Sequence, residues 1–222
     1  MTKPFTWSYS SLDLFKQCPH KYYRLRVVKD IVEPESEQMR YGKELHKAAE
    51  DYIKSDVEIP QKFAFIREPL TKLKAMKGEK FVEHRLGLTR DLTPCDFFDK
   101  DVWWRGIPDL LIIDGDKARL IDYKTGKSSK YASKKQLEIL SLAVFKHFPQ
   151  VKHVKAGLLF VVAEDFVKAE YGAFQEHLYW QDWLHDVGRL EKAVELGVWN
   201  PRPNFSCKGW CPVVDCSHNG RR

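Results

Sequence analysis

Two carboxylates and an amine stand in segments of the chain that are otherwise apolar. Asp109 lies in the apolar run 107–113, and Asp122 and Lys124 lie at the end of a second run, 118–123. Buried charges without partners are costly, so a group of opposite charge is expected to meet them. Carboxylate oxygens suit hard divalent cations such as Mg²⁺ or Mn²⁺. These three residues therefore predict a site for a divalent cation.

A β-hairpin would bring the two apolar runs side by side. The segment 114–116, Asp-Gly-Asp, separates them and is typical of a tight turn. Because side chains alternate along a strand, Asp122 and Lys124 are expected on one face, together with Leu120. The alternative is a surface hairpin whose charges are solvated, so the interpretation depends on what the rest of the chain supplies.

A helix predicted over 36–54 would add a nitrogen ligand. Ser36 is a plausible N-cap for this helix. An apolar stripe with helical spacing follows, formed by Met39, Gly42, His46, Ala49 and Ile53. His46 is therefore expected on the inward face, where a histidine can be a hydrogen-bonded core residue or a metal ligand. Neutral imidazole binds metals well when its second nitrogen is held by a hydrogen bond, and the predicted hairpin favours the ligand.

These motifs resemble the core of the PD-(D/E)XK nuclease superfamily. The signature is Gly-Ile-Pro before Asp109 and Asp-Tyr-Lys at 122–124, and the Thr-Gly at 125–126 is similar to the RecB-type branch. The segment 42–46, Gly-Lys-Glu-Leu-His, resembles the Gly-x-x-x-His element of that branch. The branch includes phage recombination exonucleases and CRISPR-adaptation nucleases, and the resemblance covers about residues 7–219.

The resemblance implies an α/β fold with a restriction-endonuclease-like mixed sheet flanked by helices. A single domain is expected over 1–222, with the element order α-α-β-β-β-α-β-α and a cysteine-rich C-terminal tail. An apolar strand over 154–162, expected to be central or parallel, and a helix over 174–196 complete it. The resemblance also implies Mg²⁺ or Mn²⁺ bound by His46, Asp109, Asp122 and the backbone carbonyl of Tyr123. Lys124 would orient the attacking water or stabilise developing charge.

The activity that the resemblance implies is hydrolysis of DNA phosphodiester bonds by a metal-dependent exonuclease, acting in recombination, repair or phage DNA end processing. Two other classes stay open. One is a structure-specific endonuclease or a CRISPR-adaptation-type trimming nuclease, and the other is a non-catalytic DNA-binding protein. The expected substrate is DNA that is single-stranded or has a free end. A recombinase or a single-strand-binding protein is the expected protein partner.

Two further polar residues fall on predicted elements near this core. Glu83 lies on a strand predicted over 79–88, where the family has a glutamate near the metals, and an ordinary edge-strand charge is the alternative. Gln136 heads the apolar face of a helix predicted over 131–148, and the family has a glutamine–tyrosine pair there. Both residues would position water, metal or the DNA strand. Leu140 occupies the position of that tyrosine, which is a departure from the family.

Four cysteines are candidates for a second metal site. They are Cys18, Cys207, Cys211 and Cys216. The resemblance implies a four-iron, four-sulfur cluster that joins the tail 199–222 to the N-terminal helix near Cys18. The first gap between the tail cysteines is wider than is typical of that branch. Zinc bound by the tail cysteines and His218, or free thiols without a metal, are the alternatives.

The N-terminal segment is expected to be helical and to break near Cys18, because Pro19 follows. Its basic and aromatic side chains can form a solvated helix face or a contact with DNA, where tyrosines stack on bases. The candidates for DNA binding are Tyr22, Tyr23, Arg24 and, after the hairpin, Lys127.

Composition limits the class of protein. A chain of 222 residues with 43% hydrophobic residues fits one globular domain. The formal net charge of +6 permits a polyanionic partner without requiring one. No apolar run is long enough to span a bilayer, and the N-terminus lacks the apolar core of a secretory signal. A cytoplasmic protein without a membrane partner is expected, a phage protein in its host's cytoplasm being one case.

Overall fold

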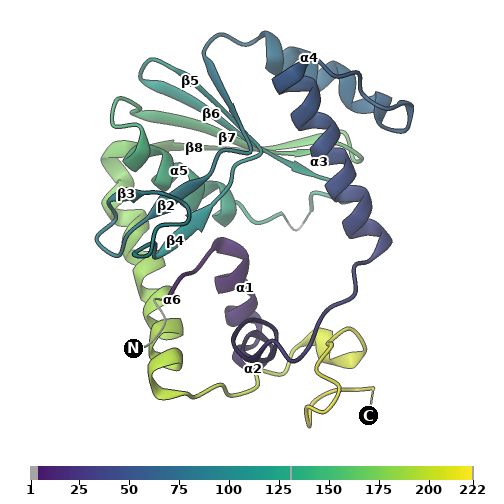
Figure 1. Cartoon of the computed structure of the whole chain (residues 1–222), viewed down its shortest axis with the longest axis vertical. Coiled ribbons are helices and arrows are strands. Elements are labelled where there is room, and N and C mark those ends of the chain that lie inside the picture. The colour runs from purple at the N-terminus through teal and green to yellow at the C-terminus, as the bar shows by residue number, and fades with distance from the viewer. Residues whose placement is uncertain (1–4, 131, 222) are drawn as a thin grey trace.

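The computed structural model of the chain describes residues 5–130 and 132–221. Its centre is a five-stranded sheet with the strand order β1-β5-β6-β7-β8 (Figure 1). The strands are β1 (Glu79–Val82), β5 (Leu110–Asp114), β6 (Lys117–Lys124), β7 (His153–Phe160) and β8 (Asp165–Gly172). β6 and β7 are parallel, and the other neighbours are antiparallel. These pairings confirm the predicted mixed sheet and the predicted parallel strand.

Helices cover both faces of this sheet (Figure 1). They are α1 (Tyr9–Gln17), α3 (Glu37–Ser55), α4 (Arg67–Ala75), α5 (Lys135–His147) and α6 (Glu176–Leu196). On one side α5, with α1 and α6, shares a hydrophobic cluster with Leu111 and Leu120. On the other side α3, α4 and the short helix η2 (Gln61–Ile66) share a second cluster with Leu110 and Ile121. Within the described ranges, no helix is both long enough and apolar enough to cross a membrane.

β5 and β6 form the predicted hairpin. Leu110 pairs with Ile121, and Gly115 in the turn has a φ of +62°, a conformation that glycine adopts without steric cost. The first strand is shorter than predicted, because it begins at Leu110. Asp109 therefore lies just before the strand and is free of its alternation, whereas Asp122 lies within β6.

The prediction of one strand over 79–88 is wrong. β1 ends at Val82, Glu83 has a φ of +50°, and the chain leaves the central sheet to form β2 (Leu86–Leu88). β2 is the middle strand of a small sheet between β3 (Pro94–Cys95) and β4 (Trp104–Gly106). The side chains of β2 are buried in the cluster that contains Trp104. The free energy gained by burying these leucines on the second sheet thus outweighs the pairing that a longer β1 would gain in the first sheet.

Two other elements differ from the sequence-based expectation. β8 was not predicted, because exposed charged residues interrupt its apolar pattern on the outer face of an edge strand. The helix predicted over 131–148 begins at Lys135, and Tyr131 lies outside the described residues.

The N-terminal helix breaks where Pro19 predicts. α1 ends at Gln17, and α2 (Pro19–Tyr22) and the π-helical turn η1 (Tyr23–Val28) continue the segment. Cys18 between α1 and α2 has extended backbone, with a φ of −161°, and its sulfur accepts a hydrogen bond from Lys21 N at 3.5 Å. Cys18 therefore acts as the N-cap of the second helix, a position that suits a side chain able to accept a hydrogen bond.

The C-terminal tail packs on this N-terminal segment (Figure 1). The Trp199 ring is stacked on Tyr22 and Tyr23, with centroid distances of 5.8 and 5.3 Å, and meets Phe15 edge-on. Hydrogen bonds run from Arg202 and Asn204 to the last carbonyls of α1, and Arg24 pairs with Asp215. The two ends of the chain are therefore held together by aromatic stacking and polar contacts.

We expect Trp199→Ala to lower the free energy of unfolding by about 2 kcal/mol, because three ring contacts are lost from a partly buried site. Urea denaturation measures this change. The matched control is Trp210→Ala, because Trp210 is 66% exposed and its ring contacts only Phe205 among the described aromatic pairs. That variant should lose less than about 1 kcal/mol. Equal losses in the two variants would contradict a structural role for the Trp199 stack.

Candidate active site

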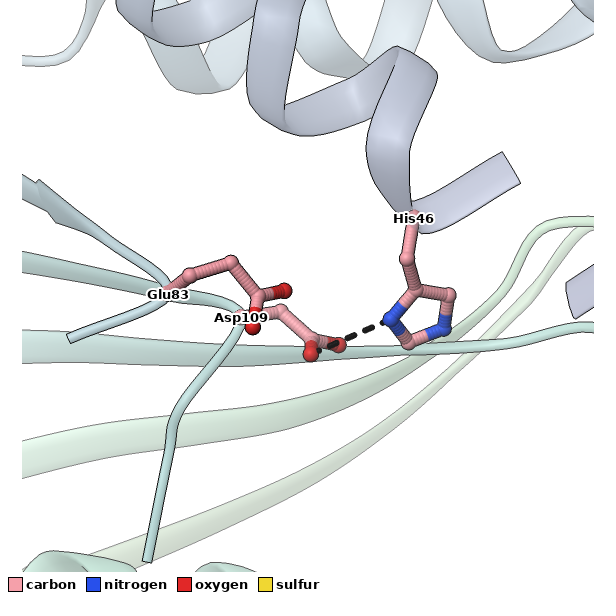
Figure 2. A group of neighbouring side chains, drawn as sticks. All are labelled: His46, Glu83 and Asp109. Carbon is pink, nitrogen blue, oxygen red and sulfur yellow. Dashed lines mark hydrogen bonds and ion pairs between the residues drawn. The ribbon is translucent and has the colours of Figure 1, made fainter. Parts of the chain in front are cut away.

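Three elements bring an imidazole and two carboxylates together at one end of the central sheet (Figure 2). His46 comes from α3, Glu83 follows β1, and Asp109 precedes β5. Ligand atoms of these three residues all lie within 4.8 Å of one another. His46 Nδ1 is 3.2 Å from Asp109 Oδ1. The predicted convergence of a histidine-bearing helix on the hairpin is thus present.

Local structure explains how each side chain reaches this place. α3 packs on the sheet through Leu45 and Ala49, which are buried, so the neighbouring His46 lies at the edge of the contact with 31% of its side chain exposed. Glu83 N donates a hydrogen bond to the carbonyl of Asp109 at 3.0 Å, and its left-handed φ ends β1. The break after β1 therefore turns the glutamate toward the aspartate.

Asp109 connects the hairpin to α3. Its carboxylate is buried; Oδ2 accepts a hydrogen bond from Tyr123 N at 2.6 Å, and Oδ1 faces His46. The first contact fixes the carboxylate on β6, so that the second oxygen is directed at the imidazole. A cation shared by His46 and Asp109 would replace their direct contact. The predicted role of the Tyr123 carbonyl as a ligand stays a prediction.

Asp122, Lys124 and Gln136 form a second set of polar contacts. Lys124 Nζ lies 2.6 Å from Asp122 Oδ2 and donates a hydrogen bond to Gln136 Oε1 at 2.9 Å. Gln136 Nε2 donates in turn to Asp122 Oδ1 at 2.5 Å. Asp122 and Lys124 thus face α5, as their alternation along β6 predicts. The structure groups Glu83, and not Asp122, most closely with His46 and Asp109.

The electrostatics of the site favour a bound cation. Burial, and then the negative charge of Asp109, raise the pKa of Glu83 to about 7. The same two causes raise the pKa of Asp122, although Lys124 opposes them. Burial opposes protonation of His46, but its hydrogen bond to Asp109 and the nearby carboxylates raise its pKa above the ordinary value. Because oxygen and imidazole donors suit Mg²⁺ or Mn²⁺, the residues present fit such an ion.

Two hollows flank these residues. A hollow of about 860 Å³ contains the three candidate ligands and is bordered by α3 and Arg85. A second hollow, of about 380 Å³, is lined by Lys124, Gln136 and Leu140. Leu140 is buried at the position where the family has a tyrosine, and Tyr9 of α1 lines the same hollow. The site therefore has space for a substrate on both sides.

The four cysteines lie where the tail meets the N-terminal segment. Cys18 Sγ accepts a hydrogen bond from Arg202 N at 3.4 Å, and Cys211 is buried. Within the described residues, no three thiols or histidines gather within 4.8 Å, as the compact tetrahedron of a zinc site requires. An iron–sulfur cluster holds its cysteine sulfurs farther apart than one zinc ion does, so the cluster stays a prediction.

The structure does not support base stacking by the N-terminal tyrosines. Tyr22 is buried, and both Tyr22 and Tyr23 stack on Trp199. Arg24 is held by Asp30 and Asp215, which also raise its pKa. These residues attach the tail, whereas Lys127 is exposed and its role in DNA binding stays a prediction.

Sequence reasoning missed two arginines beside the site. Arg85 borders the larger hollow and Arg105 the smaller one. Both lie next to the adjacent rings of Phe97 and Phe98, in a segment that had no assigned role. The available signal was the pair of phenylalanines within an otherwise polar stretch.

The chain has a similar fold to a solved structure and matches a sequence family. The chain is similar to a solved structure described as a "Putative exonuclease" from Eubacterium rectale, with 11% identity over 94% of this chain and 87% of that chain, at a TM-score of 0.55. It also aligns with the solved structure of SSO0001, with 15% identity over 99% of this chain and 89% of that chain, at a TM-score of 0.46. No curated protein sequence matches it significantly. A family model, described as the PD-(D/E)XK nuclease superfamily, matches residues 6–216, which include every residue of the two polar sets. The chain therefore belongs to the PD-(D/E)XK nuclease superfamily.

Proposed function

We propose that this nuclease-superfamily protein is a metal-dependent DNA exonuclease. The observation that carries the proposal is the convergence of His46, Glu83 and Asp109 beside the ion-paired Asp122 and Lys124. The first set offers oxygen and nitrogen ligands, and the second offers a cationic head at hydrogen-bonding distance from neighbouring groups. Hydrolysis of a phosphodiester needs both, because charge develops on the attacking water and on the phosphoryl oxygens.

His46, Glu83 and Asp109 would hold Mg²⁺ or Mn²⁺, with Asp122 and the Tyr123 carbonyl completing the set. The bound ion would acidify water and stabilise negative charge on the phosphoryl group. The Lys124 ammonium donates hydrogen bonds to the attacking water or to a phosphate oxygen. Gln136 and Asp122 hold that ammonium in place through their contacts of 2.9 and 2.6 Å.

Action from a DNA end is supported by the solved neighbour from Eubacterium rectale, which is described as a "Putative exonuclease". The hollow of about 380 Å³ beside Lys124 also offers space of the size of a single nucleotide. We propose a role in recombination, repair or phage DNA end processing, in the cytoplasm, with a recombinase or single-strand-binding protein as partner. A structure-specific or trimming endonuclease is the second candidate, because both hollows are open to a continuous strand.

We expect Lys124→Ala and Asp109→Asn to lower kcat by roughly 10²–10³-fold or more, because Lys124 would stabilise negative charge in the transition state and Asp109 would hold the ion that does the same. The assay follows release of nucleotides from end-labelled linear DNA with Mg²⁺ or Mn²⁺. Lys168→Ala, on the exposed edge strand β8, is the matched control and should keep its rate. Wild-type cleavage by either site variant would contradict the proposal.

A closed single-stranded circle distinguishes the two nuclease classes. An exonuclease leaves the circle intact while it digests the linear form of the same sequence. Cutting of the circle at a comparable rate would favour the endonuclease.

The raised pKa of Glu83 predicts a pH-dependent affinity for metal. Below about pH 7 its carboxyl is protonated, so a cation must displace a proton, and affinity should fall about tenfold per pH unit for each displaced proton. The folded protein also holds the Glu83 and His46 protons more tightly than the unfolded chain. Metal-free protein should therefore lose stability as the pH rises from about 4.5 through about 7, the ordinary and the raised pKa of Glu83, and His46 should add a further loss above its ordinary pKa of 6.5; Mn²⁺ should restore the lost stability.

Thermal unfolding with and without Mn²⁺ across this range measures both effects. In Glu83→Gln the metal-dependent rise in Tm should be smaller and should depend less on pH. An unchanged pH dependence in this variant would show that Glu83 does not bind the ion.

We also propose that Cys18, Cys207, Cys211 and Cys216 hold a four-iron cluster that joins the two ends of the chain. Anaerobically purified protein should then contain iron and sulfide and absorb visible light. Cys211→Ser should lose the iron and have a lower Tm. Cys95→Ser, whose cysteine lies outside this group, should keep the iron and the wild-type Tm. A colourless protein with stoichiometric zinc would contradict the cluster.

A further inference from the structure

The small sheet β3-β2-β4 carries a cluster of two arginines and two phenylalanines, which we call the Arg–Phe cluster. Phe97 and Phe98 follow β3, and their ring centroids are 5.1 Å apart. The Arg85 guanidinium carbon is 5.1 Å from the Phe98 centroid. The Arg105 guanidinium carbon is 5.3 Å from the Phe97 centroid and 5.7 Å from that of Phe98. Each ring thus lies within cation–π distance of an arginine.

The Arg–Phe cluster lies where the two hollows meet. Arg85 borders the hollow that contains the candidate metal ligands, and Arg105 borders the hollow that contains Lys124. Ile107 is exposed and lines both, so the hollows adjoin at this residue. In Figure 1 the small sheet and α3 lie on opposite sides of the centre of the molecule. A strand that passes from one hollow to the other therefore passes Arg85 and Arg105, and the rings of Phe97 and Phe98 lie beside these arginines.

The two arginines are available to an anionic ligand. In the part of the chain that the structure describes, neither guanidinium forms an ion pair, and Arg105 Nε is buried without a hydrogen-bond partner. The nearby Asp96 and Asp99 instead accept hydrogen bonds from backbone N–H groups of their own loop. Asp96 Oδ1 accepts a hydrogen bond from Phe98 N at 2.8 Å, and Asp99 Oδ1 accepts one from Asp101 N at 2.8 Å. By contrast, Arg24 at the tail pairs with two aspartates.

Phe98 has a large open surface that the fold does not use. The residue is 65% exposed, although its loop is fixed by the hydrogen bonds of Asp96 and Asp99. An exposed aromatic ring beside unpaired guanidinium groups is the combination that binds single-stranded nucleic acid, with bases stacked on rings and phosphates on cations. A base inside an intact duplex is already stacked and cannot reach such a ring.

We propose that the Arg–Phe cluster binds single-stranded DNA next to the scissile bond, with one base stacked on Phe98 and flanking phosphates held by Arg85 and Arg105. The proposal rests on the proposed nuclease function and names its substrate class as a single strand or a frayed end. Phe98 is then a positioning residue. It sets the register of the strand on the metal site without touching the reacting phosphate.

We expect Phe98→Ala to raise KM for end-labelled single-stranded DNA by roughly tenfold, the loss of one base–aromatic stack, with kcat within about twofold of wild type. Phe98→Trp should restore KM, whereas Phe98→Leu should not. Phe174→Ala is the matched control, because that residue is 74% exposed and lines a different hollow, with Lys117 and His153. Full restoration by leucine would overturn the stacking proposal.

Substrates with a single abasic position identify the stacked base. With the wild-type protein, one position relative to the cut should raise KM as much as Phe98→Ala does. With the Phe98→Ala protein, the same abasic position should have no further effect, because both changes remove one contact. Additive losses at every position would overturn the proposal.

Binding measured by fluorescence anisotropy separates this proposal from the nuclease function. If Phe98→Ala binds and digests a single strand like wild type, the stacking site is wrong and the nuclease stands. If the wild-type protein cleaves no DNA with Mg²⁺ or Mn²⁺, the nuclease is wrong. A tenfold weaker binding of the oligonucleotide by Phe98→Ala would then still support the stacking site. A covalently closed circular duplex, which has neither ends nor unpaired loops, should bind equally to the two proteins.

Discussion

One buried carboxylate determines how the candidate site is assembled. Asp109 binds Tyr123 N on β6 through one oxygen and faces His46 on α3 through the other, while its carbonyl accepts a hydrogen bond from Glu83 N. Asp109 thus contacts the hairpin, the residue after β1 and the helix that carries His46, and it fixes their positions relative to one another. A buried charge needs such partners, so the same contacts that make the carboxylate tolerable also aim it at the site.

The alternation of β6 divides the site into two sets with different tasks. The backbone of Tyr123 serves Asp109 on the side of α3, while its neighbours Asp122 and Lys124 project toward Gln136 on α5. Ligands for a cation therefore gather mainly on one side, and the ammonium is held on the other. Asp122 and Lys124 are two residues apart on β6, so their side chains leave the same face of the sheet, while the intervening Tyr123 fixes Asp109 through its backbone N–H.

Much of this site could be predicted because its signals are local. The turn at Gly115 defines the hairpin, the strand period places Asp122 with Lys124, and helical spacing places His46 on α3. The direction of the Glu83 side chain depends on a break in the strand after β1. Burial of Leu86 in the second sheet imposes this break, so the position of Glu83 in the site could not be predicted from periodicity. The role of Tyr22 depends on Trp199, a contact across most of the chain that no local pattern reveals.

The stack of Trp199 on Tyr22 and Tyr23 also bears on how the protein forms in the cell. The helical segment that carries Tyr22 and Tyr23 is synthesised well before Trp199, its aromatic partner. Contacts between residues so far apart in sequence are slow to form, because a long loop must close before they contribute. The aromatic rings of the N-terminal segment therefore lack this partner until Trp199 has been synthesised.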